Sequence, residues 1–126
     1  MAEIRFGKAL NQALHDAMSA DETVILLGED IAAAGGPFGV TRGLMDAFGA
    51  ERVRDTPISE ATLISASAGA ALSGLRPVVE IMFMDFITLG MDGLVNQAAK
   101  ARFMFGGQTS VPMVLRTPHG GGLSAG

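Results

Sequence analysis

The first elements are indicated by the spacing of apolar residues along the chain. Near the amino terminus the apolar residues follow the period of an α-helix: Phe6, Ala9, Leu10, Ala13, Leu14, Ala17 and Met18. We therefore expect an amphipathic helix over about residues 5–20. Residues 24–28 form a short, continuous apolar run with acidic residues on both sides. This pattern is typical of a strand that is buried on both faces, as in a parallel sheet.

Apolar runs and helical patterns alternate through the rest of the chain. A glycine-rich loop is expected over 32–39, and after it Thr41 could cap a short helix that ends at Phe48. The remaining expected elements are a short strand from Val53, a helix over 59–73, a strand over 77–83, a helix over 87–104 and a strand over 111–117. This order predicts an α/β fold, an open and mainly parallel sheet with helices on both faces.

Composition narrows the class of protein. With 126 residues and 48% hydrophobic content, the chain is at most one domain with a core. Its net charge of −4 argues against a nucleic-acid surface, and zero cysteines exclude disulfides and thiolate metal sites. The amino terminus lacks the character of a signal or transit peptide, and no apolar run approaches the roughly 18 residues of a membrane span. We expect a cytoplasmic protein without membrane contact.

Residues 55–60, Asp-Thr-Pro-Ile-Ser-Glu, place one carboxylate, that of Glu60, at the start of a helix. Pro57 closes a turn that brings Ser59 to the capping position, and the unpaired N–H groups of a helix start attract an acidic side chain. Helix capping alone would account for Glu60. Its neighbours are apolar, however, so we expect burial to raise the pKa of Glu60, against the pull of the helix dipole. A carboxyl poised in this way can exchange a proton with a bound heterocycle.

Several short motifs occur together with this glutamate. In chain order they are Leu-Leu-Gly-Glu-Asp at 26–30, Gly-Val-Thr-Arg-Gly-Leu at 39–44, Asp-Thr-Pro-Ile-Ser-Glu at 55–60, Gly-Leu-Arg-Pro-Val at 74–78, Glu-Ile-Met-Phe-Met-Asp-Phe at 80–86, Asn-Gln-Ala-Ala-Lys at 96–100 and Phe-Gly-Gly at 105–107. With these motifs the whole chain resembles the beta subunit of the thiamine-diphosphate-dependent decarboxylase component of 2-oxo acid dehydrogenase complexes. Members act on pyruvate, branched-chain 2-oxo acids or acetoin.

The resemblance implies a transketolase-like, pyrimidine-binding fold for thiamine diphosphate. Residues 1–126 would be the amino-terminal part of that domain, because the glycine-rich segment from Pro118 ends the sequence where the family continues. His119 does not match the position of the family's catalytic histidine. A sheet shortened in this way should expose an edge and an apolar face, which favours association.

The resemblance also implies roles for individual residues. Glu60 matches the catalytic glutamate that hydrogen-bonds a ring nitrogen of the cofactor's aminopyrimidine. Glu29, at the carboxyl end of the first strand, matches an acidic residue near the cofactor. Phe86 would stack on the aminopyrimidine, with Ile58 and Met82 as apolar walls. The plain alternatives are a polar residue at a strand end for Glu29 and a core aromatic for Phe86.

The sequence lacks the Gly-Asp-Gly motif that holds Mg²⁺ and the diphosphate in such enzymes. An alpha subunit would therefore supply the metal and the phosphate site, and this chain would hold no metal. A second beta subunit would complete a heterotetramer, a lipoyl acyltransferase component would accept the acyl group, and the isolated chain would be inactive. Asp92, Asn96 and Lys100 share a helix face and would form a solvated or subunit-facing stripe.

Three alternatives remain open at this point. The chain could belong to an acetoin-cleaving dehydrogenase as its beta subunit, which the segments around 96–100 and 104–107 favour. It could be a split transketolase-like subunit with another acceptor. It could also be an association module without chemistry, which keeps a vestigial pocket.

Overall fold

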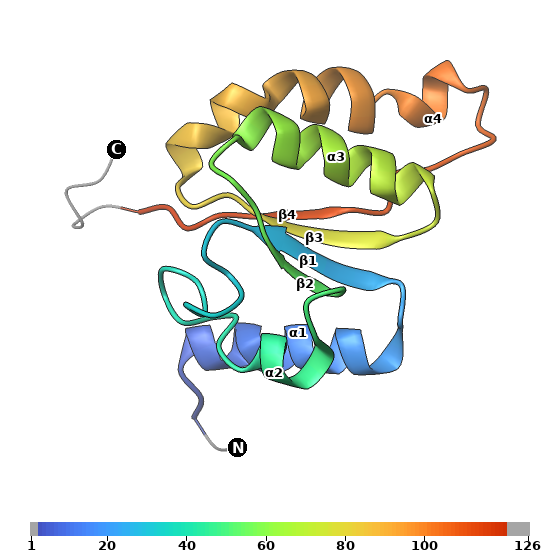
Figure 1. Cartoon of the computed structure of the whole chain (residues 1–126). Helices are drawn as coiled ribbons and strands as arrows, with labels where there is room; N and C mark the ends of the chain where they lie inside the picture. The colour runs from blue at the N-terminus through green and yellow to red at the C-terminus, as the bar shows by residue number, and fades with distance from the viewer. Residues whose placement is uncertain (1–2, 121–126) are drawn as a thin grey trace.

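A parallel sheet of four strands forms the centre of the computed structural model, which describes residues 3–120 (Figure 1). In chain order the strands are β1 (Val24–Gly28), β2 (Val53–Asp55), β3 (Arg76–Glu80) and β4 (Val114–Arg116). They lie in the order β2-β1-β3-β4, and each neighbouring pair is parallel. The predicted open parallel sheet is confirmed.

Helices cover both faces of this sheet (Figure 1). One face carries α1 (Phe6–Ala20) and α2 (Leu44–Phe48), and the other carries α3 (Glu60–Leu72) with the helical segment that follows β3. Each layer has its own apolar cluster. Met18, Leu26 and Leu44 belong to the cluster under α1, whereas Ile64 and Val79 belong to the cluster under α3. Because the sheet is buried on both faces, a strand such as β1 is continuously apolar instead of alternating between apolar and polar residues.

The predicted single helix over 87–104 is wrong. The chain instead forms a 3₁₀-helix η1 (Met84–Gly90), a π-helix η2 (Asp92–Ala98) and a short α4 (Ala101–Met104). A β-carbon on Gly90 would lie 2.4 Å from Ile64 Cδ1, and one on Gly93 would lie 2.6 Å from Ser65 Oγ. Contact with α3 at this short range sets the backbone path here, and it overrides the regular helical period.

The stripe of polar residues in this segment is confirmed. Asn96 donates a hydrogen bond to the Asp92 carboxylate at 2.8 Å, and Lys100 donates to Asn96 Oδ1 at 2.7 Å. All three side chains are exposed.

Two further expectations need correction. Thr41 does not cap α2, which begins at Leu44 after Gly43 in the left-handed region (φ 80°). The Thr41 side chain is buried, and its hydroxyl donates to the Ile31 carbonyl at 2.7 Å because a buried hydroxyl needs a partner. Strands β3 and β4 are also shorter than the predicted 77–83 and 111–117, since the chain turns into η1 after Ile81 and β4 pairs with a single neighbour. The part of the glycine-rich segment after Gly120 lies outside the described residues.

Candidate active site

The strands of the parallel sheet all end at one edge, which we call the carboxyl edge. Gly28 at the end of β1 is the register partner of Asp55 on β2 and of Glu80 on β3. The Thr56 N–H also donates to the Gly28 carbonyl at 3.0 Å. The segments that follow these strands, which carry most of the predicted site residues, therefore leave the sheet side by side. Open α/β sheets bind ligands at this edge.

Glu60 is the first residue of α3, and its side chain is buried, with 7% of the residue exposed. Ser59 occupies the predicted capping position, but its side chain makes no capping bond to the backbone. Its hydroxyl donates to Thr62 Oγ1 at 2.8 Å instead. The Glu60 carboxyl thus lies at the positive end of α3, where no other side chain caps the free N–H groups.

Glu29 follows β1 and is also buried, with 7% of the residue exposed. Burial raises the pKa of its carboxyl, and the charges of Glu60 and Asp30 raise that pKa further. In the described part of the chain, Glu29 Oε1 has no hydrogen-bond partner. The two buried carboxyls are therefore electrostatic neighbours, and Glu29 keeps its proton to higher pH than an ordinary glutamate.

The backbone beside Glu29 is strained. Asp30 has a φ of 54°, a conformation that residues other than glycine rarely adopt. Its carbonyl accepts a hydrogen bond from the Gly36 N–H at 2.8 Å, which ties the start of the glycine loop to the carboxyl edge. Such strain is concentrated at functional sites, where the surrounding structure maintains it.

Apolar side chains near these carboxyls are partly uncovered. Ile58 is 80% exposed, and Phe86 on η1 is 41% exposed, so Phe86 is not a core aromatic. Phe86 meets Phe83 edge-on, with ring centroids 6.1 Å apart. Met82, the third predicted apolar wall, is half-buried just after β3. The end of η1 lies against the start of α3, because a β-carbon on Gly90 would be 3.0 Å from the Glu60 carbonyl oxygen.

Sequence reasoning missed two polar features at this edge. Thr56 Oγ1 is buried and has no hydrogen-bond partner among the described residues. Glu80 is buried at the end of β3 and forms an ion pair with Arg116 at the end of β4. The sequence did carry a signal for this pair, because Glu80 and Arg116 each lie at the end of an apolar strand and have opposite charges. His119 is exposed.

Residues 3–120 contain no group of three or more His, Cys, Asp or Glu side chains placed to hold a metal ion. None of the helices in the same range is long and apolar enough to cross a membrane.

The four-stranded parallel sheet with helices on both faces places the chain among the open α/β domains, which bind ligands at the carboxyl edge of the sheet. Residues 2–126 match the family model of the transketolase pyrimidine-binding domain, and the chain belongs to that family. It is 47% identical over 97% of its length to the acetoin:2,6-dichlorophenolindophenol oxidoreductase subunit beta of Bacillus subtilis (strain 168). It is also 47% identical over 99% of its length to the pyruvate dehydrogenase E1 component subunit beta of Acholeplasma laidlawii.

A third relative, the 2-oxoisovalerate dehydrogenase subunit beta of Bacillus subtilis (strain 168), is 40% identical over 98% of this chain. The predicted similarity to beta subunits of this kind is confirmed. The chain spans 39%, 38% and 38% of the lengths of these three relatives, in the order given.

Proposed function

We propose that this chain provides the aminopyrimidine half of a thiamine-diphosphate site in the beta subunit of a 2-oxo acid dehydrogenase. The observation that carries the proposal is Glu60, a buried carboxyl at the uncapped start of α3 in a pyrimidine-binding domain. The names of the relatives, which include pyruvate and 2-oxoisovalerate dehydrogenases, support the same activity.

The residues at the carboxyl edge fit an aminopyrimidine ring. A flat heteroaromatic ring needs apolar contacts on its faces, and Ile58 and Phe86 leave such surface uncovered. Its ring nitrogens and amino group need polar partners, and Glu60 and the unpaired oxygen of Glu29 would supply them. The Thr56 hydroxyl is a further buried group at this edge that lacks a partner in the described structure.

When bound, the cofactor would supply a thiazolium carbon that adds to the carbonyl of the substrate. Glu60 would hold and exchange a proton at a ring nitrogen of the pyrimidine, which is general acid–base catalysis. Ile58, Met82 and Phe86 would orient the ring and exclude water from it. Glu29, whose pKa is raised by burial and by the charges of Glu60 and Asp30, would offer a carboxyl oxygen beside the ring.

The rest of the site would come from other chains. An alpha subunit with a Gly-Asp-Gly motif would hold Mg²⁺ and the diphosphate, since this sequence lacks that motif. A second beta subunit would complete the heterotetramer, and a lipoyl acyltransferase component would accept the acyl group. We place this assembly in the cytoplasm.

A second substrate class has its own support. The relative whose name refers to acetoin is as similar as the pyruvate dehydrogenase relative, at 47% identity for both. Acetoin cleavage is therefore the second candidate reaction. Assays of the assembled enzyme with pyruvate, 2-oxoisovalerate and acetoin, under one set of conditions, decide between the two classes by the ratio of kcat/KM.

The substitution Glu60→Gln tests the proposed catalytic role. Gln keeps the size of the side chain but cannot exchange a proton, so deuterium exchange at the thiazolium carbon should slow by about 10²–10⁴-fold while the cofactor stays bound. Exchange is followed by NMR after acid quench, in the chain assembled with its alpha subunit.

The variant Glu22→Gln is the matched control, because Glu22 is exposed and lies at the other end of β1. It should leave the exchange rate unchanged. If Glu60 only caps α3, Glu60→Gln would cost about 1 kcal/mol or less of stability and leave exchange intact. That result would favour a split transketolase-like subunit with another base, or an association module, over the proposed enzyme.

A further inference from the structure

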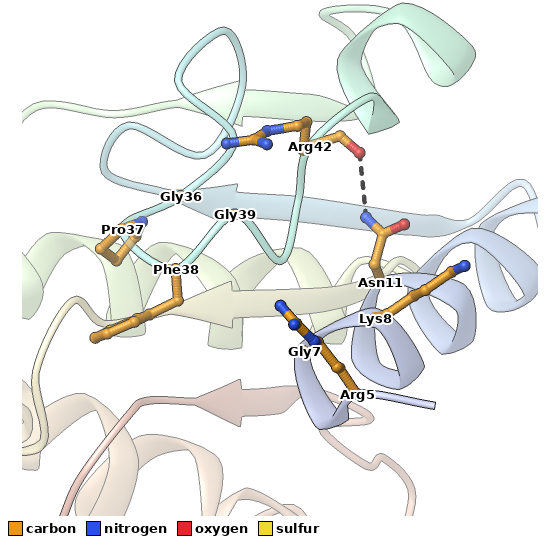
Figure 2. Close-up of a pocket in the computed structure, with 9 residues that line it drawn as sticks. All are labelled: Arg5, Gly7, Lys8, Asn11, Gly36, Pro37, Phe38, Gly39 and Arg42. Carbon is orange, nitrogen blue, oxygen red and sulfur yellow. Dashed lines mark hydrogen bonds between the residues drawn. The ribbon is translucent and has the colours of Figure 1, made fainter. Parts of the chain in front are cut away.

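A pocket lies on the face of the sheet that α1 covers, opposite the face that α3 covers, and its charged lining residues are all cations. It has a volume of about 750 Å³ and lies between the first turn of α1 and the glycine loop before α2 (Figure 2). Arg5 immediately precedes α1, Lys8 lies in the first turn of α1, and Arg42 comes from the loop. The whole chain carries a net charge of −4, so these three residues form a positive site on an acidic protein. We call this site the cationic pocket.

The three cations have no acidic partner in the part of the chain that the structure describes, where salt bridges involve other residues. The Asn11 amide fixes the loop against α1 by donating to the Val40 carbonyl at 2.6 Å and to the Arg42 carbonyl at 3.1 Å, and Figure 2 shows the second bond. The Arg42 guanidinium also lies close to Gly39, because a β-carbon there would be 3.6 Å from Arg42 Nη2. The three cationic residues therefore line one hollow between the start of α1 and the loop.

The first turn of α1 adds positive potential of its own. The helix begins after Arg5 with no side-chain cap and no acidic residue in its first turn. Its first N–H groups carry the positive end of the helix dipole, which acidic residues usually occupy. Cations at this end, such as Arg5 and Lys8, lower the stability of the helix. Residues that lower local stability in this way are often found at functional sites. An anion bound at the helix start would offset the unfavourable charges of Arg5 and Lys8.

The cationic pocket is also close to the carboxyl edge. The short connection over 21–23 makes α1 antiparallel to β1, so the start of α1 lies near the end of β1 (Figure 1). The glycine loop joins the two places, since the Gly36 N–H donates to the Asp30 carbonyl while Gly36 and Phe38 line the pocket. An anion in the pocket would thus fix a loop that begins beside Glu29.

We propose that the cationic pocket binds an anion that carries phosphate groups. Phosphate suits it better than a single carboxylate, because tetrahedral phosphate oxygens can accept bonds from helix N–H groups and from two or three cationic side chains together. Phe38, which is 51% exposed, places apolar surface beside these charges for the organic part of a phosphate ester. The volume matches that of small-molecule sites, which span roughly 300–1,000 Å³. This site is separate from the proposed cofactor site and does not depend on it.

Titration with inorganic pyrophosphate at low salt tests the proposal, with amide NMR shifts of the chain as the readout. We expect a dissociation constant below about 1 mM, with the largest shifts at Gly7, Lys8 and Gly39. The double variant Arg5→Gln, Lys8→Gln should weaken binding at least about tenfold, since it removes two charge-assisted contacts. Its melting temperature without anion should equal or exceed that of the wild type, because two unfavourable charges leave the helix start.

The variant Arg54→Gln is the matched control. Arg54 is a half-exposed arginine on β2, outside the pocket, so its loss should change the affinity less than about twofold. A second titration with a nucleoside diphosphate separates the two sources of phosphate. If the nucleoside diphosphate binds more tightly than pyrophosphate, and Phe38→Ala removes that difference, the pocket binds an organic phosphate. If the two affinities are equal, the pocket binds an inorganic phosphate.

Three results would overturn the proposal. One is a dissociation constant for pyrophosphate above about 1 mM, and another is an equal loss of affinity in the control and in the double variant. The third is a set of amide shifts centred on Glu29 and Glu60 instead of the cationic pocket.

Discussion

Glu80 and Arg116 are register partners on the neighbouring strands β3 and β4, and their side chains form an ion pair at the carboxyl edge. Only 4% of Glu80 is exposed, and burial raises the pKa of its carboxyl, although the Arg116 guanidinium opposes this shift. The carboxylate also lies next to the glycine loop, since a β-carbon on Gly36 would be 3.5 Å from Glu80 Oε1. The pair joins the two strands at the point where the glycine loop approaches Glu80.

Removal of the arginine from this pair should destabilise the chain. Arg116→Met leaves Glu80 buried without its counter-charge, which should cost about 3–5 kcal/mol in urea denaturation at neutral pH. The loss should shrink at acidic pH, where protonation neutralises the buried carboxyl. Arg54→Met breaks an exposed pair with Glu51 and should cost about 1 kcal/mol or less. Equal losses in the two variants would show that burial of Glu80 does not matter.

Glu29 should make stability depend on pH. Its pKa is raised in the folded chain by burial, then by Glu60 and Asp30, above the ordinary value of 4.5. Between 4.5 and the raised value the folded state binds more protons than the unfolded state, so the free energy of unfolding falls as pH rises through this window. Glu29→Gln should remove that part of the pH dependence and gain stability at neutral pH.

Denaturation of the chain at several values between about pH 4 and 8 measures this effect as the difference between wild type and Glu29→Gln. Glu22→Gln, which removes an exposed carboxyl, should give a curve parallel to that of the wild type. A difference between wild type and Glu29→Gln that stays constant with pH would contradict the assignment.

Phe86 should matter for the cofactor more than for the fold. Because it is 41% exposed, Phe86→Ala should cost well below the roughly 3–5 kcal/mol of a buried phenylalanine. In the assembled enzyme the same change should lower the affinity for thiamine diphosphate about tenfold, because ring stacking and buried area are lost. Affinity and melting temperature are measured together. Phe6→Ala is the control, because Phe6 on α1 is 78% exposed. A large fall in melting temperature with unchanged affinity would make Phe86 a structural residue.

The contact between η1 and the start of α3 should leave no room for a side chain at position 90. A β-carbon on Gly90 would lie 2.4 Å from Ile64 Cδ1 and 3.0 Å from the Glu60 carbonyl oxygen. The Ile64 side chain can move, but the backbone oxygen cannot, so Gly90→Ala should destabilise the chain by about 1–3 kcal/mol. It should also weaken cofactor binding in the assembled enzyme, because η1 carries Phe86.

Gly69 offers the opposite case on α3. It is exposed, and a β-carbon there would meet nothing within 4 Å. Gly69→Ala should therefore stabilise the chain by about 0.5–1 kcal/mol, since alanine loses less entropy in a helix. Thermal or urea denaturation of both variants provides the comparison, and equal effects would refute the packing argument for Gly90.

The amino-acid sequence was sufficient to predict the elements that depend on local apolar patterns. The predicted helix over 5–20 and strand over 24–28 correspond to α1 and β1, and the parallel sheet with helices on both faces is confirmed. The helix that starts with Glu60 was also predicted to within a residue. These features follow from the period of buried residues within one element, which a chain expresses without reference to distant segments.

The tertiary structure decided everything that depends on contacts between distant segments. The long helix expected over 87–104 became η1, η2 and α4 because Gly90 and Gly93 pack closely on α3. Thr41 became a buried donor to Ile31 instead of a helix cap. Local propensity differs between such alternatives by about 1 kcal/mol or less per residue, and packing with buried hydrogen bonds outweighs it.

The same holds for the charged groups. The proximity of Glu29 to Glu60, and of Arg42 to the start of α1, depends on which segments the sheet brings to its carboxyl edge. The sequence marks each of these residues as polar, but it does not give their separations. Electrostatic effects such as the raised pKa of Glu29 depend on distance and burial, and only the folded chain sets both.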